Sequence, residues 1–439
     1  MENNFEIQTL GAATIPSPLN LAKEDGNKFY RFVEEDDQFL ADITLQGFDT
    51  CIQHNIRPAC LDKAGPREHL YFNPKNTKAA IVTCGGLCPG VNNVIRSLVM
   101  ALHYFYGSER ILGIPYGFEG LVPEKGHEFI ELHPDKVKDI HQFGGTYLGS
   151  SRGAQNVERM VDTLIEHKID MLFAIGGDGT LRGAEAIARE TEKRGSDIAI
   201  IGIPKTIDND IDLIDKSFGF ETAFDTATPI IRDAHNEAAG AYNGVAIVKL
   251  MGRDSGFIAA SAAIAMPVVN FVLIPEMSFE LGGKNGFLAA LKKRLDLKHH
   301  AVIVVAEGAG QHLFETDSVP KTDASGNIQH RDIGIFLKDS IKHYFESLSQ
   351  EITVKYIDPS YIIRSAPANA SDSVLCNQLA YNAVHAAMAG KTKCVVGKMN
   401  NQLVHLPISK VIEKRKKIDV EGDLWFSALQ STGQPFSLL

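Results

Sequence analysis

The stretch Thr206-Ile207-Asp208-Asn209-Asp210 places two carboxylates two residues apart, with Lys205 directly before it. Asp208 and Asp210 can face different ways, so that one accepts a proton while the other joins a hydrogen-bond or metal network. The Lys205 ammonium suits a phosphate or a leaving group. The apolar run DIAIIGI precedes these residues, which favours a buried strand end over a solvated acidic turn. A carboxylate, a lysine and a glycine-rich loop together are typical of phosphoryl transfer, which depends on positioning and charge neutralisation.

A second chemical stretch, FAIGGDGTLRGA, places Asp178 among three glycines. Met171 to Ile175 predicts a buried strand and Thr180 onward predicts a helix, so we expect Gly176 to Gly179 to form the turn between them. Amides at a helix N-terminus favour anions, and phosphate is the natural ligand. A carboxylate there would repel phosphate unless Mg²⁺ lay between them, and Mg²⁺ uses one or two carboxylates plus substrate oxygens. The alternative is a tight turn with an acidic residue at the start of the helix.

Further hydrogen-bond donors lie in Met251-Gly252-Arg253 and in Tyr361-Ile362-Ile363-Arg364. The planar guanidinium of arginine binds two phosphate oxygens together. Either arginine could instead form an ordinary surface ion pair. Glu307 closes the apolar run HAVIVVA and needs a polar partner, for which a sugar hydroxyl is suited.

These residues follow apolar runs that lack alternation and are rich in Val, Ile and Ala, which predicts strands buried on both faces. The runs are KAAIVTC, MLFAI, DIAIIGI, VAIVKL, NFVLI and HAVIVVA. Amphipathic, helix-like segments such as NVERMVDTLIEHKI lie between them, so we expect parallel sheets with right-handed crossovers. The runs are followed in turn by GGLCPG, GGDGT, PKTIDND, MGRDSG, PE and EGAG. Ligands bind outside the carboxyl ends of such strands, and six loops at six strand ends predict one cleft.

Composition excludes several classes of protein. The 439 residues carry a formal net charge of −10 with no basic block, whereas nucleic acids and anionic membranes require clustered Lys and Arg. The start MENNFEIQTLGA lacks the features of a signal peptide, and no apolar stretch reaches membrane-spanning length. The six cysteines are scattered without a zinc pattern. We therefore expect a cytoplasmic protein with free thiols that binds neither nucleic acid nor membranes.

The glycine-rich loops also argue against two common cofactor sites. Neither GGLCPG nor GGDG spells the dinucleotide fingerprint G-x-G-x-x-G. Ala389-Gly390-Lys391-Thr392 is similar to the end of a P-loop, but His385 stands where the leading glycine belongs, and the segment follows a helix-like stretch. We expect Gly390 to end that helix.

Taken together, the motifs resemble the phosphofructokinase family from about Lys78 to Leu406, closest to the clade of plant-type and protist-type ATP-dependent enzymes. The resemblance implies an α/β protein of two doubly wound, Rossmann-like parallel-sheet domains, with the active site in the cleft between them. The implied organisation is an N-terminal extension (1–75), a nucleotide-binding domain (76–219), a fructose 6-phosphate-binding domain (220–361), and a return segment that completes the first domain and adds a C-terminal tail (362–439).

The resemblance also assigns roles to residues. Asp208 is implied to be the base that takes the proton of the attacking 1-hydroxyl, and Asp178 the magnesium ligand. Thr206, Lys205 and Arg253 complete the implied catalytic set. The implied nucleotide site contains Gly86, Arg152, Gly153, Gly177, Asp178, Gly179 and Thr180. The implied sugar-phosphate site contains Thr206, Ile207, Asp208, Met251, Gly252, Arg253, Glu307, Lys355, Tyr361, Ile362, Ile363 and Arg364.

The implied activity is that of a glycolytic, ATP-dependent 6-phosphofructokinase with Mg²⁺ and ATP, acting as a homodimer or homotetramer. Two positions conflict on the phosphoryl donor. Lys205 is typical of pyrophosphate users, whereas Gly179 is typical of ATP users, where pyrophosphate users have aspartate. We expect ATP, because Gly179 bears on whether the nucleotide fits. The alternative is a pyrophosphate-dependent fructose 6-phosphate 1-phosphotransferase.

Some positions depart from the bacterial pattern. Tyr361 and Lys355 stand where that pattern has histidine and arginine, and Gly244 replaces another arginine. At three positions of the bacterial effector site the chain has Met100, Pro134 and Asn236, so we do not expect regulation by the bacterial effectors.

Two other classes of function share part of this pattern. GGDGT also occurs in lipid kinases and NAD kinases, but such an enzyme does not need TIDND, MGR and YIIR together. A catalytically inactive sensor of nucleotides or sugar phosphates would be expected to lose the base or the metal ligand, yet Asp208 and Asp178 are both present.

Overall fold

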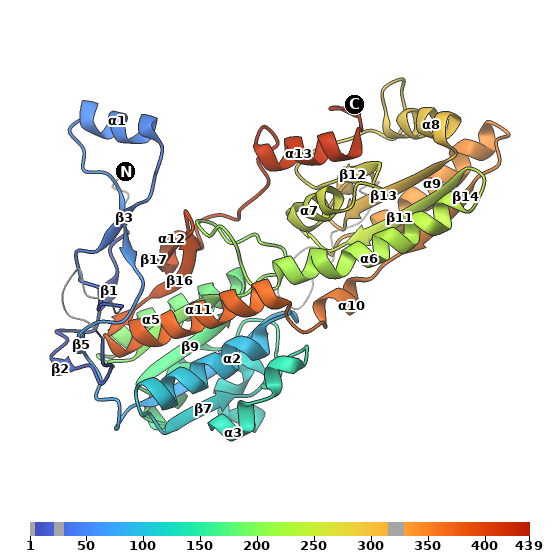
Figure 1. Ribbon diagram of the computed structural model, residues 1–439. Helices are drawn as coiled ribbons and strands as arrows, with labels where there is room; N and C mark the ends of the chain where they lie inside the picture. The colour runs from blue at the N-terminus through green and yellow to red at the C-terminus, as the bar shows by residue number, and fades with distance from the viewer. Residues whose placement is uncertain (1–4, 22–29, 315–328) are drawn as a thin grey trace. The chain divides into compact units, whose positions relative to one another are not determined.

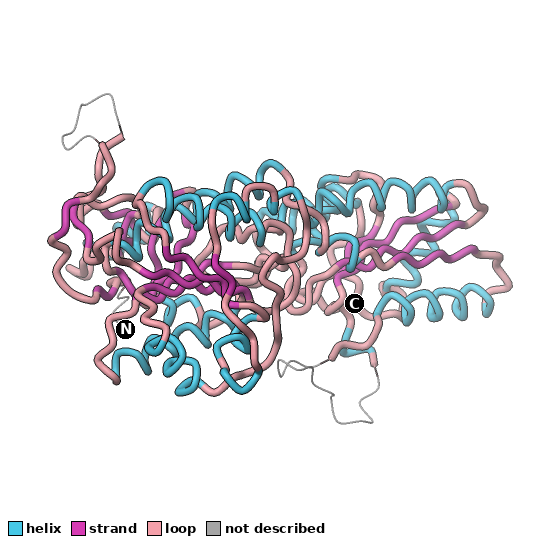
Figure 2. The backbone as a smooth tube through the Cα atoms, turned by 90° about the horizontal axis from the view of Figure 1, so that it is seen from below, coloured by secondary structure: helices cyan, strands magenta, loops and turns pink. Residues whose placement is uncertain are grey.

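The computed structural model describes residues 5–21, 30–314 and 329–439, and the chain divides into two compact units. The first unit comprises residues 1–206, 211–219 and 367–415, and the second comprises 207–210, 220–366 and 416–439. In each unit, helices cover both faces of a sheet (Figures 1 and 2). This arrangement confirms the predicted α/β class with two Rossmann-like units.

The sheet of the first unit is parallel at its centre and antiparallel at both edges. The central strands run parallel in the order β16, β10, β9, β6 and β7, while the outer pairs are antiparallel. In spatial order the strands are β3 (Gln38–Leu40), β4 (Cys60–Lys63), β17 (Gln402–Pro407), β16 (Cys394–Met399), β10 (Ala199–Pro204), β9 (Met171–Gly176), β6 (Lys78–Thr83), β7 (Arg110–Ile114) and β8 (Ile130–Glu131). The predicted runs KAAIVTC, MLFAI and DIAIIGI form β6, β9 and β10.

Helices cover the central strands of this sheet on both faces. On one face, every second residue of each strand points into a core, as Val82 of β6 and Leu172 of β9 do. Helices α4 (Val157–Glu166) and α5 (Asp178–Lys193) pack against this core. The opposite face carries α2 (Val91–Met100) and α11 (Ala370–Met388), which pack together and, through α11, against β10 and β16. Strand β9 extends to Gly176 and helix α5 begins at Asp178, so only Gly177 remains of the four-residue turn that was expected from Gly176 to Gly179. After α11, Gly390 has a φ of +78°, as expected for a residue that ends a helix.

The second unit is built on a four-stranded, wholly parallel sheet. Its strands lie in the order β12 (Phe271–Leu273), β13 (His300–Ala306), β11 (Gly244–Leu250) and β14 (Thr353–Ile357). One face packs against α6 (Phe220–Ala239), α7 (Phe257–Ala265) and α13 (Asp423–Thr432). The other face packs against α8 (Phe287–Lys298) and α9 (Ile333–Ser347). The runs VAIVKL, NFVLI and HAVIVVA form β11, β12 and β13, as predicted.

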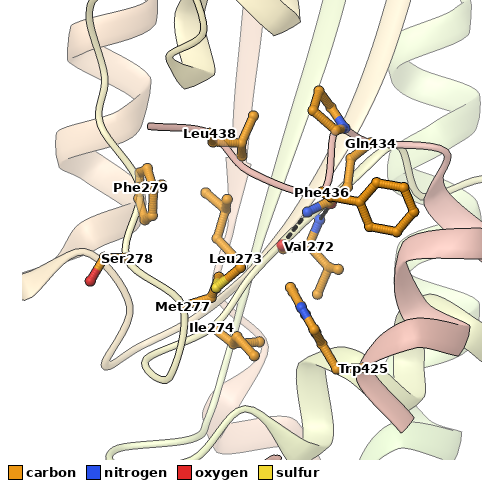
Figure 3. Close-up of a pocket in the computed structure, with 11 residues that line it drawn as sticks. Val272, Leu273, Ile274, Met277, Ser278, Phe279, Trp425, Gln434, Phe436 and Leu438 are labelled. Atoms are coloured by element: carbon orange, nitrogen blue, oxygen red, sulfur yellow. Dashed lines mark hydrogen bonds between the residues drawn. The ribbon is translucent and has the colours of Figure 1, made fainter. Parts of the chain in front are cut away.

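Residues 416–439 belong to the second unit, whereas we expected residues 362–439 to complete the first domain and add a C-terminal tail. The Gln434 side chain accepts a hydrogen bond from the Val272 amide at 2.6 Å and donates one to the Val272 carbonyl at 3.3 Å (Figure 3). Leu438 is buried beside these contacts, and Trp425 of α13 is buried in the core. The chain returns to the first unit only for residues 367–415, because the apolar face of α13 packs on α7.

The residues before β6 belong to the first unit, contribute β3 and β4 to its sheet and form further short strands. Two antiparallel pairs form, between β1 (Gln8–Thr9) and β15 (Lys391–Thr392) and between β2 (Ile15–Pro16) and β5 (His69–Leu70). Helix α1 (Leu45–Gln53), all of which is described, has no buried residue. The remaining short helical segments are Ala101–Phe105, Gly117–Leu121, Pro123–Lys125, α3 (Pro134–Val137), Ile140–Gln142, Gln311–Leu313, α10 (Ser360–Arg364) and α12 (Ile408–Val411). Among the residues that the structure describes, none of the helices is both long and apolar enough to cross a bilayer.

A buried group of charges joins the N-terminal segment to the sheet of the first unit. The Asp62 carboxylate on β4 contacts the Lys391 ammonium at 3.1 Å and the Arg67 guanidinium at 3.3 Å, and it hydrogen-bonds to the His405 ring on β17. Burial alone would raise the pKa of Asp62, but the hydrogen bond with His405 and the neighbouring positive charges lower it to about 2. The carboxylate is therefore ionised and neutralises buried cations.

Replacing Asp62 with alanine should lower the free energy of unfolding of the protein by about 3–5 kcal/mol, because the variant leaves Lys391 and Arg67 buried without that counter-charge. Denaturant unfolding followed by circular dichroism measures the change. Asp49→Ala, on the exposed surface of α1, is the matched control and should change stability by less than about 0.5 kcal/mol. Equal stabilities of the two variants would contradict a structural role for this charge group.

Candidate active site

Lys205 brings two glycine loops of the first unit together at the ends of β6, β9 and β10. Its amide donates to the Gly176 carbonyl at 2.9 Å, and its ammonium donates to the Gly86 carbonyl at 2.5 Å. The residue is only 6% exposed. Burial lowers the pKa of Lys205, and the charge of Arg152 acts in the same direction. The lysine that sequence analysis placed beside the reacting phosphate is thus held between GGLCPG and GGDGT.

The loop that carries Arg152 and Gly153 joins the same group. The Gly85 amide donates to the Ser151 carbonyl at 3.1 Å, and the Ser150 hydroxyl donates to the Gly85 carbonyl at 2.6 Å. A Cβ placed on Gly86 would lie 3.2 Å from the Arg152 guanidinium. Arg152 is exposed, and Gly153 has a φ of +100°, which favours glycine. The structure therefore brings together all the loops predicted to form the nucleotide site.

The GGDGT segment contains glycines with different structural demands. A Cβ on Gly176 would lie 2.1 Å from the Thr180 hydroxyl, so the packing of the first turn of α5 requires glycine there. Gly177 precedes the helix, and a Cβ on it would lie 3.3 Å from the Lys205 carbonyl. By contrast, a Cβ on Gly179 would have no atom of the described residues within 4 Å apart from its chain neighbours and the backbone of its own helix. The structure leaves open space beside Gly179, and packing within the chain does not require glycine at this position.

Asp178 is the first residue of α5, and its side chain is 21% exposed. Its carboxylate pairs with Arg182 at 3.1 Å and lies 3.9 Å from Arg415. One accessible carboxylate beside a loop predicted to bind phosphate fits the ligand set of Mg²⁺, which takes few protein ligands and retains waters and substrate oxygens. Asp178 therefore fits the predicted magnesium ligand.

The segment TIDND passes from the first unit to the second. Thr206 belongs to the first unit, where its carbonyl accepts a hydrogen bond from the Ser217 hydroxyl at 2.6 Å. Ile207 packs against the core of the second unit. The chain turns at Asn209, which has a φ of +55°, a conformation that asparagine tolerates better than most residues. Asp208 and Asp210 lie on either side of this turn.

Asp208 is held by the MGRDSG segment that follows β11. The Arg253 amide donates to the Asp208 carboxylate at 3.4 Å, and the Ser255 hydroxyl donates to the Asp208 carbonyl at 2.9 Å. Gly252 has a φ of +125°, and a Cβ on it would lie 2.3 Å from the Ser255 carbonyl. Glycine is therefore required for this approach.

The strand beside β11 contributes Glu307 to the same edge of the sheet. The Glu307 amide donates to the Leu250 carbonyl at 2.9 Å, and the Gly308 amide donates to the Gly252 carbonyl at 3.1 Å. Met251, between these two contacts, is 7% exposed. Asp208, the residues Met251 to Arg253 and Glu307 thus form one group, as sequence analysis predicted.

The pKa of Asp208 is raised well above its ordinary value. Burial is the largest cause, and the negative charges of Asp210, Glu307 and Asp254 act in the same direction. The hydrogen bond from the Arg253 amide favours the ionised form but does not outweigh them. A carboxylate with a raised pKa is a better proton acceptor at neutral pH than an ordinary aspartate.

Helix α10 carries the four residues Tyr361 to Arg364. Ile363 is fully buried in the core of the second unit and anchors the helix, whereas Tyr361 and Ile362 are mostly exposed. The Arg364 guanidinium lies over the Tyr361 ring at 4.4 Å. Its Nε is buried with no hydrogen-bond partner among the described residues. Arg364 thus retains a buried donor that an anion could satisfy.

Lys355 does not lie with the other predicted site residues of the second unit. It pairs with Glu237 of α6 and stands opposite Ala246 in the β11–β14 register. Ala246 precedes Leu250, the last residue of β11, by four positions, or about 13 Å of extended strand. Within one chain, the structure does not bring Lys355 to the edge that carries Arg253, and its place in the sugar-phosphate site stays a prediction.

Sequence reasoning assigned no role to three residues that hold the site. Ser255 stands in the quoted motif MGRDSG, but only the structure shows its hydrogen bond to Asp208. Ser150 holds the GGLCPG loop. The His330 ring hydrogen-bonds to the Arg253 carbonyl at 3.1 Å, and no motif indicated this residue.

Comparison with known proteins agrees with this arrangement. The family model described as Phosphofructokinase matches residues 78–387. An ATP-dependent 6-phosphofructokinase of Borreliella burgdorferi is 54% identical over 385 residues, which cover 86% of this chain and 86% of the relative. The ATP-dependent 6-phosphofructokinase of Amycolatopsis methanolica is 46% identical over 438 residues, which cover 99% of this chain and 95% of the relative.

Solved structures agree on the fold. The crystal structure of a pyrophosphate-dependent phosphofructokinase from Marinobacter aquaeolei matches with a TM-score of 0.66 and 22% identity, and the match covers 81% of this chain and 91% of that one. At this identity the likeness concerns the fold alone. The family model spans the loops after β6, β9, β10, β11 and β13 described above, and the relatives match most of the sequence. The chain belongs to the phosphofructokinase family.

Proposed function

We propose that this chain is an ATP-dependent 6-phosphofructokinase of glycolysis. It transfers the γ-phosphate of ATP to the 1-hydroxyl of fructose 6-phosphate and releases fructose 1,6-bisphosphate and ADP. The observation that carries the proposal is the Asp208 carboxylate, whose pKa is raised and which lies beside Arg253. The position of the active site in a cleft between the two domains stays a prediction.

Asp208 is the general base in this proposal. The attacking hydroxyl must lose its proton as the new phosphate ester forms, and a positioned carboxylate contributes about 10²–10⁴-fold by accepting it. The negative charges of Asp210 and Glu307 make the ionised form of Asp208 less favourable, which increases its affinity for the proton. The Ser255 hydrogen bond fixes the backbone that carries the base.

The residues proposed for the donor are Gly86, Arg152, Gly153, Lys205 and Gly177 to Thr180. The amides at the start of α5 and the Lys205 ammonium supply positive charge toward a polyphosphate. Asp178 would hold Mg²⁺, which when bound neutralises part of the charge on the donor phosphates. Arg182 and Arg415 both face the Oδ2 atom of Asp178, so the Oδ1 atom is the oxygen that would bind the ion.

The residues proposed for the acceptor are Thr206, Ile207, Met251 to Arg253, Glu307 and Tyr361 to Arg364. Arginine is suited to the 6-phosphate because its planar group donates two hydrogen bonds. Arg364 has a buried Nε without a partner among the described residues, and an anion would satisfy it. Glu307 is suited to accept a hydrogen bond from a sugar hydroxyl.

The open space beside Gly179 supports ATP as the donor, and so do the relatives named ATP-dependent 6-phosphofructokinase. The pyrophosphate-dependent alternative is favoured by Lys205 alone. ATP carries a nucleoside that pyrophosphate lacks. The space beside Gly179, which only ATP needs, therefore decides between the two donors.

We also propose a cytoplasmic location and assembly as a homodimer or homotetramer. All six cysteines, each within the described ranges, are free thiols, which suits a reducing compartment. Helix α1 exposes Leu45, Phe48 and Ile52, and an assembly could bury this apolar surface. Light scattering after size-exclusion chromatography measures the number of subunits, and a monomer would contradict the proposed assembly.

The proposed activity is tested with the purified protein, fructose 6-phosphate, Mg²⁺ and either ATP or pyrophosphate. We expect fructose 1,6-bisphosphate and ADP with ATP, and a much lower rate with pyrophosphate. If no fructose 1,6-bisphosphate forms with either ATP or pyrophosphate, the proposed activity is contradicted. A preference for pyrophosphate would establish the pyrophosphate-dependent phosphotransferase instead.

Gly179→Asp should abolish the use of ATP while the protein stays folded, because the structure offers space for the new side chain. A carboxylate about 4 Å from a phosphate charge adds a repulsion of about 4 kcal/mol at an effective dielectric constant near 20. Donor kinetics of the variant measure this loss and any gain of pyrophosphate use. Gly179→Ala separates added volume from added charge, and Gly282→Asp, also at a glycine with open space, is the matched control. A Gly179→Asp variant that retains ATP use would refute the argument.

Asp208→Asn should lower kcat by about 10²–10⁴-fold and raise the melting temperature at pH 8. Folding raises the pKa of Asp208, so the fold prefers the protonated carboxyl, and this stabilisation is lost as the pH rises through the folded-state pKa. Asparagine removes the unfavourable charge at alkaline pH, and each 1 kcal/mol raises the Tm of a domain of this size by about 2–4 °C.

Thermal unfolding of both proteins between pH 5 and 8 measures this difference, which should shrink as the pH falls. Asp339→Asn, on the exposed surface of α9, should show no such dependence. An Asp208→Asn variant with normal turnover, or one less stable than the wild type at pH 8, would contradict the assigned role.

A further inference from the structure

Lys249 lies near the end of β11, two residues before Met251, and contacts two acidic residues from different segments of the second unit. Its ammonium lies 2.7 Å from Asp332 and 2.9 Å from Asp358, and the side chain is 11% exposed. The ring centroid of Tyr356 lies 5.8 Å from the ammonium. A buried lysine between two carboxylates is well neutralised, and removing it would leave two like charges together.

The two carboxylates that Lys249 contacts each organise the start of a helix. Asp332 caps α9 by accepting the Ile335 amide at 3.0 Å, and it accepts the Tyr356 hydroxyl at 3.0 Å. Asp358 accepts the Ser360 amide at 3.1 Å and the Ser360 hydroxyl at 2.5 Å, at the start of α10.

The register of the sheet independently places Asp358 beside Lys249. Val248 stands opposite Ile357 in the parallel pair of β11 and β14, so the next residues on the two strands are Lys249 and Asp358. Hydrogen bonds with Asp332, Tyr356 and Asp358 outweigh the opposing effect of burial and raise the pKa of Lys249. Burial opposes ionisation of the two carboxyl groups, but hydrogen bonds from Lys249 and the Ile335 amide lower the pKa of Asp332, and hydrogen bonds from Ser360 and Lys249 lower that of Asp358. All three groups are therefore charged at neutral pH.

We propose that Lys249 is a positioning residue that holds α10 at the carboxyl end of β11, so that Arg364 and Arg253 are aligned for one sugar phosphate. Lys249 itself touches neither arginine in the contacts described. It acts through Asp358, which begins the segment that carries Tyr361 and Arg364, while its own strand continues directly into Met251 to Arg253. The inference rests on the proposed function, because it assigns these arginines to fructose 6-phosphate.

The test is the steady-state kinetics of Lys249→Met, which keeps the length of the side chain and removes its charge. We expect the KM for fructose 6-phosphate to rise about tenfold, since small misplacements of binding groups are costly. Loss of binding that is equal in the ground and transition states leaves kcat nearly unchanged, and the KM for ATP should stay as in the wild type. Lys249→Arg should restore most of the affinity, and Lys342→Met, an exposed lysine on α9, is the matched control.

A second pair of variants separates positioning from folding. Asp358→Asn should raise the KM for fructose 6-phosphate as Lys249→Met does, and the double variant should raise it by less than the product of the two single effects. Asp332→Asn should affect the KM much less, since asparagine also caps helices well. If Lys249→Met fails to fold, the Asp358→Asn variant decides the question.

Isothermal titration calorimetry with fructose 6-phosphate, in the absence of a phosphoryl donor, tests the proposed function separately from the positioning role of Lys249. A wild type that neither binds nor phosphorylates fructose 6-phosphate would overturn the proposed function. An active wild type combined with an unchanged KM in both Lys249→Met and Asp358→Asn would overturn the positioning role alone. A parallel loss of kcat and of both KM values in these variants, with a lowered melting temperature, would show a merely structural role and would also overturn it.

Discussion

The proposed chemistry depends on one electrostatic constraint, the placement of Asp208 among other carboxylates. Asp210, Glu307 and Asp254 all raise the pKa of this aspartate, in addition to the effect of burial. Such an arrangement destabilises the folded chain at neutral pH, so the surrounding backbone must enforce it. Gly308 allows the end of β13 to approach the residues after β11, because a Cβ on it would lie 1.8 Å from the Arg253 carbonyl oxygen, and Gly252 allows the tight loop after β11, because a Cβ on it would lie 2.3 Å from the Ser255 carbonyl oxygen. The fold thus sustains an unfavourable charge that a general base requires.

Parallel strand order explains how residues far apart in the sequence reach one place within each unit. In the first unit, Lys205 contacts the loops after β6 and β9, because the three strands are neighbours and end at the same edge. In the second unit, β13 and β14 flank β11 and bring Glu307 and the α10 segment to the end that carries Arg253. Lys249 and Asp358 then join two of these ends by an ion pair. The register of the sheet thus sets the approximate positions of the proposed site residues, and specific polar contacts set their exact positions.

Much of this arrangement could be predicted from the sequence, for identifiable reasons. Unbroken runs of Val, Ile and Ala located six strands, and the glycines and charges after them located the loops. The assignment of residues 416–439 to the second unit could not be predicted from the sequence. It depends on the packing of α13 against α7, a tertiary contact that no local sequence pattern indicates. The position of Lys355 within one chain could not be predicted for a related reason, since its distance from Arg253 follows from its register on β14. The contacts of Ser255 and His330 with this site require side-chain geometry, which spacing in the sequence does not give.

The most direct test of the central claim is the pH dependence of kcat at saturating fructose 6-phosphate and ATP, for the wild type and for Asp210→Asn. Saturation removes the ionisation of the free substrates from the profile. Because a base must be ionised to act, kcat should fall as the pH drops through a pKa well above the ordinary aspartate value of about 3.9. Removing the Asp210 charge should move this fall to lower pH, since that charge raises the pKa of Asp208. A fall at the ordinary value, an unshifted profile in the variant, or loss of activity in Asp210→Asn comparable to that in Asp208→Asn would contradict the account.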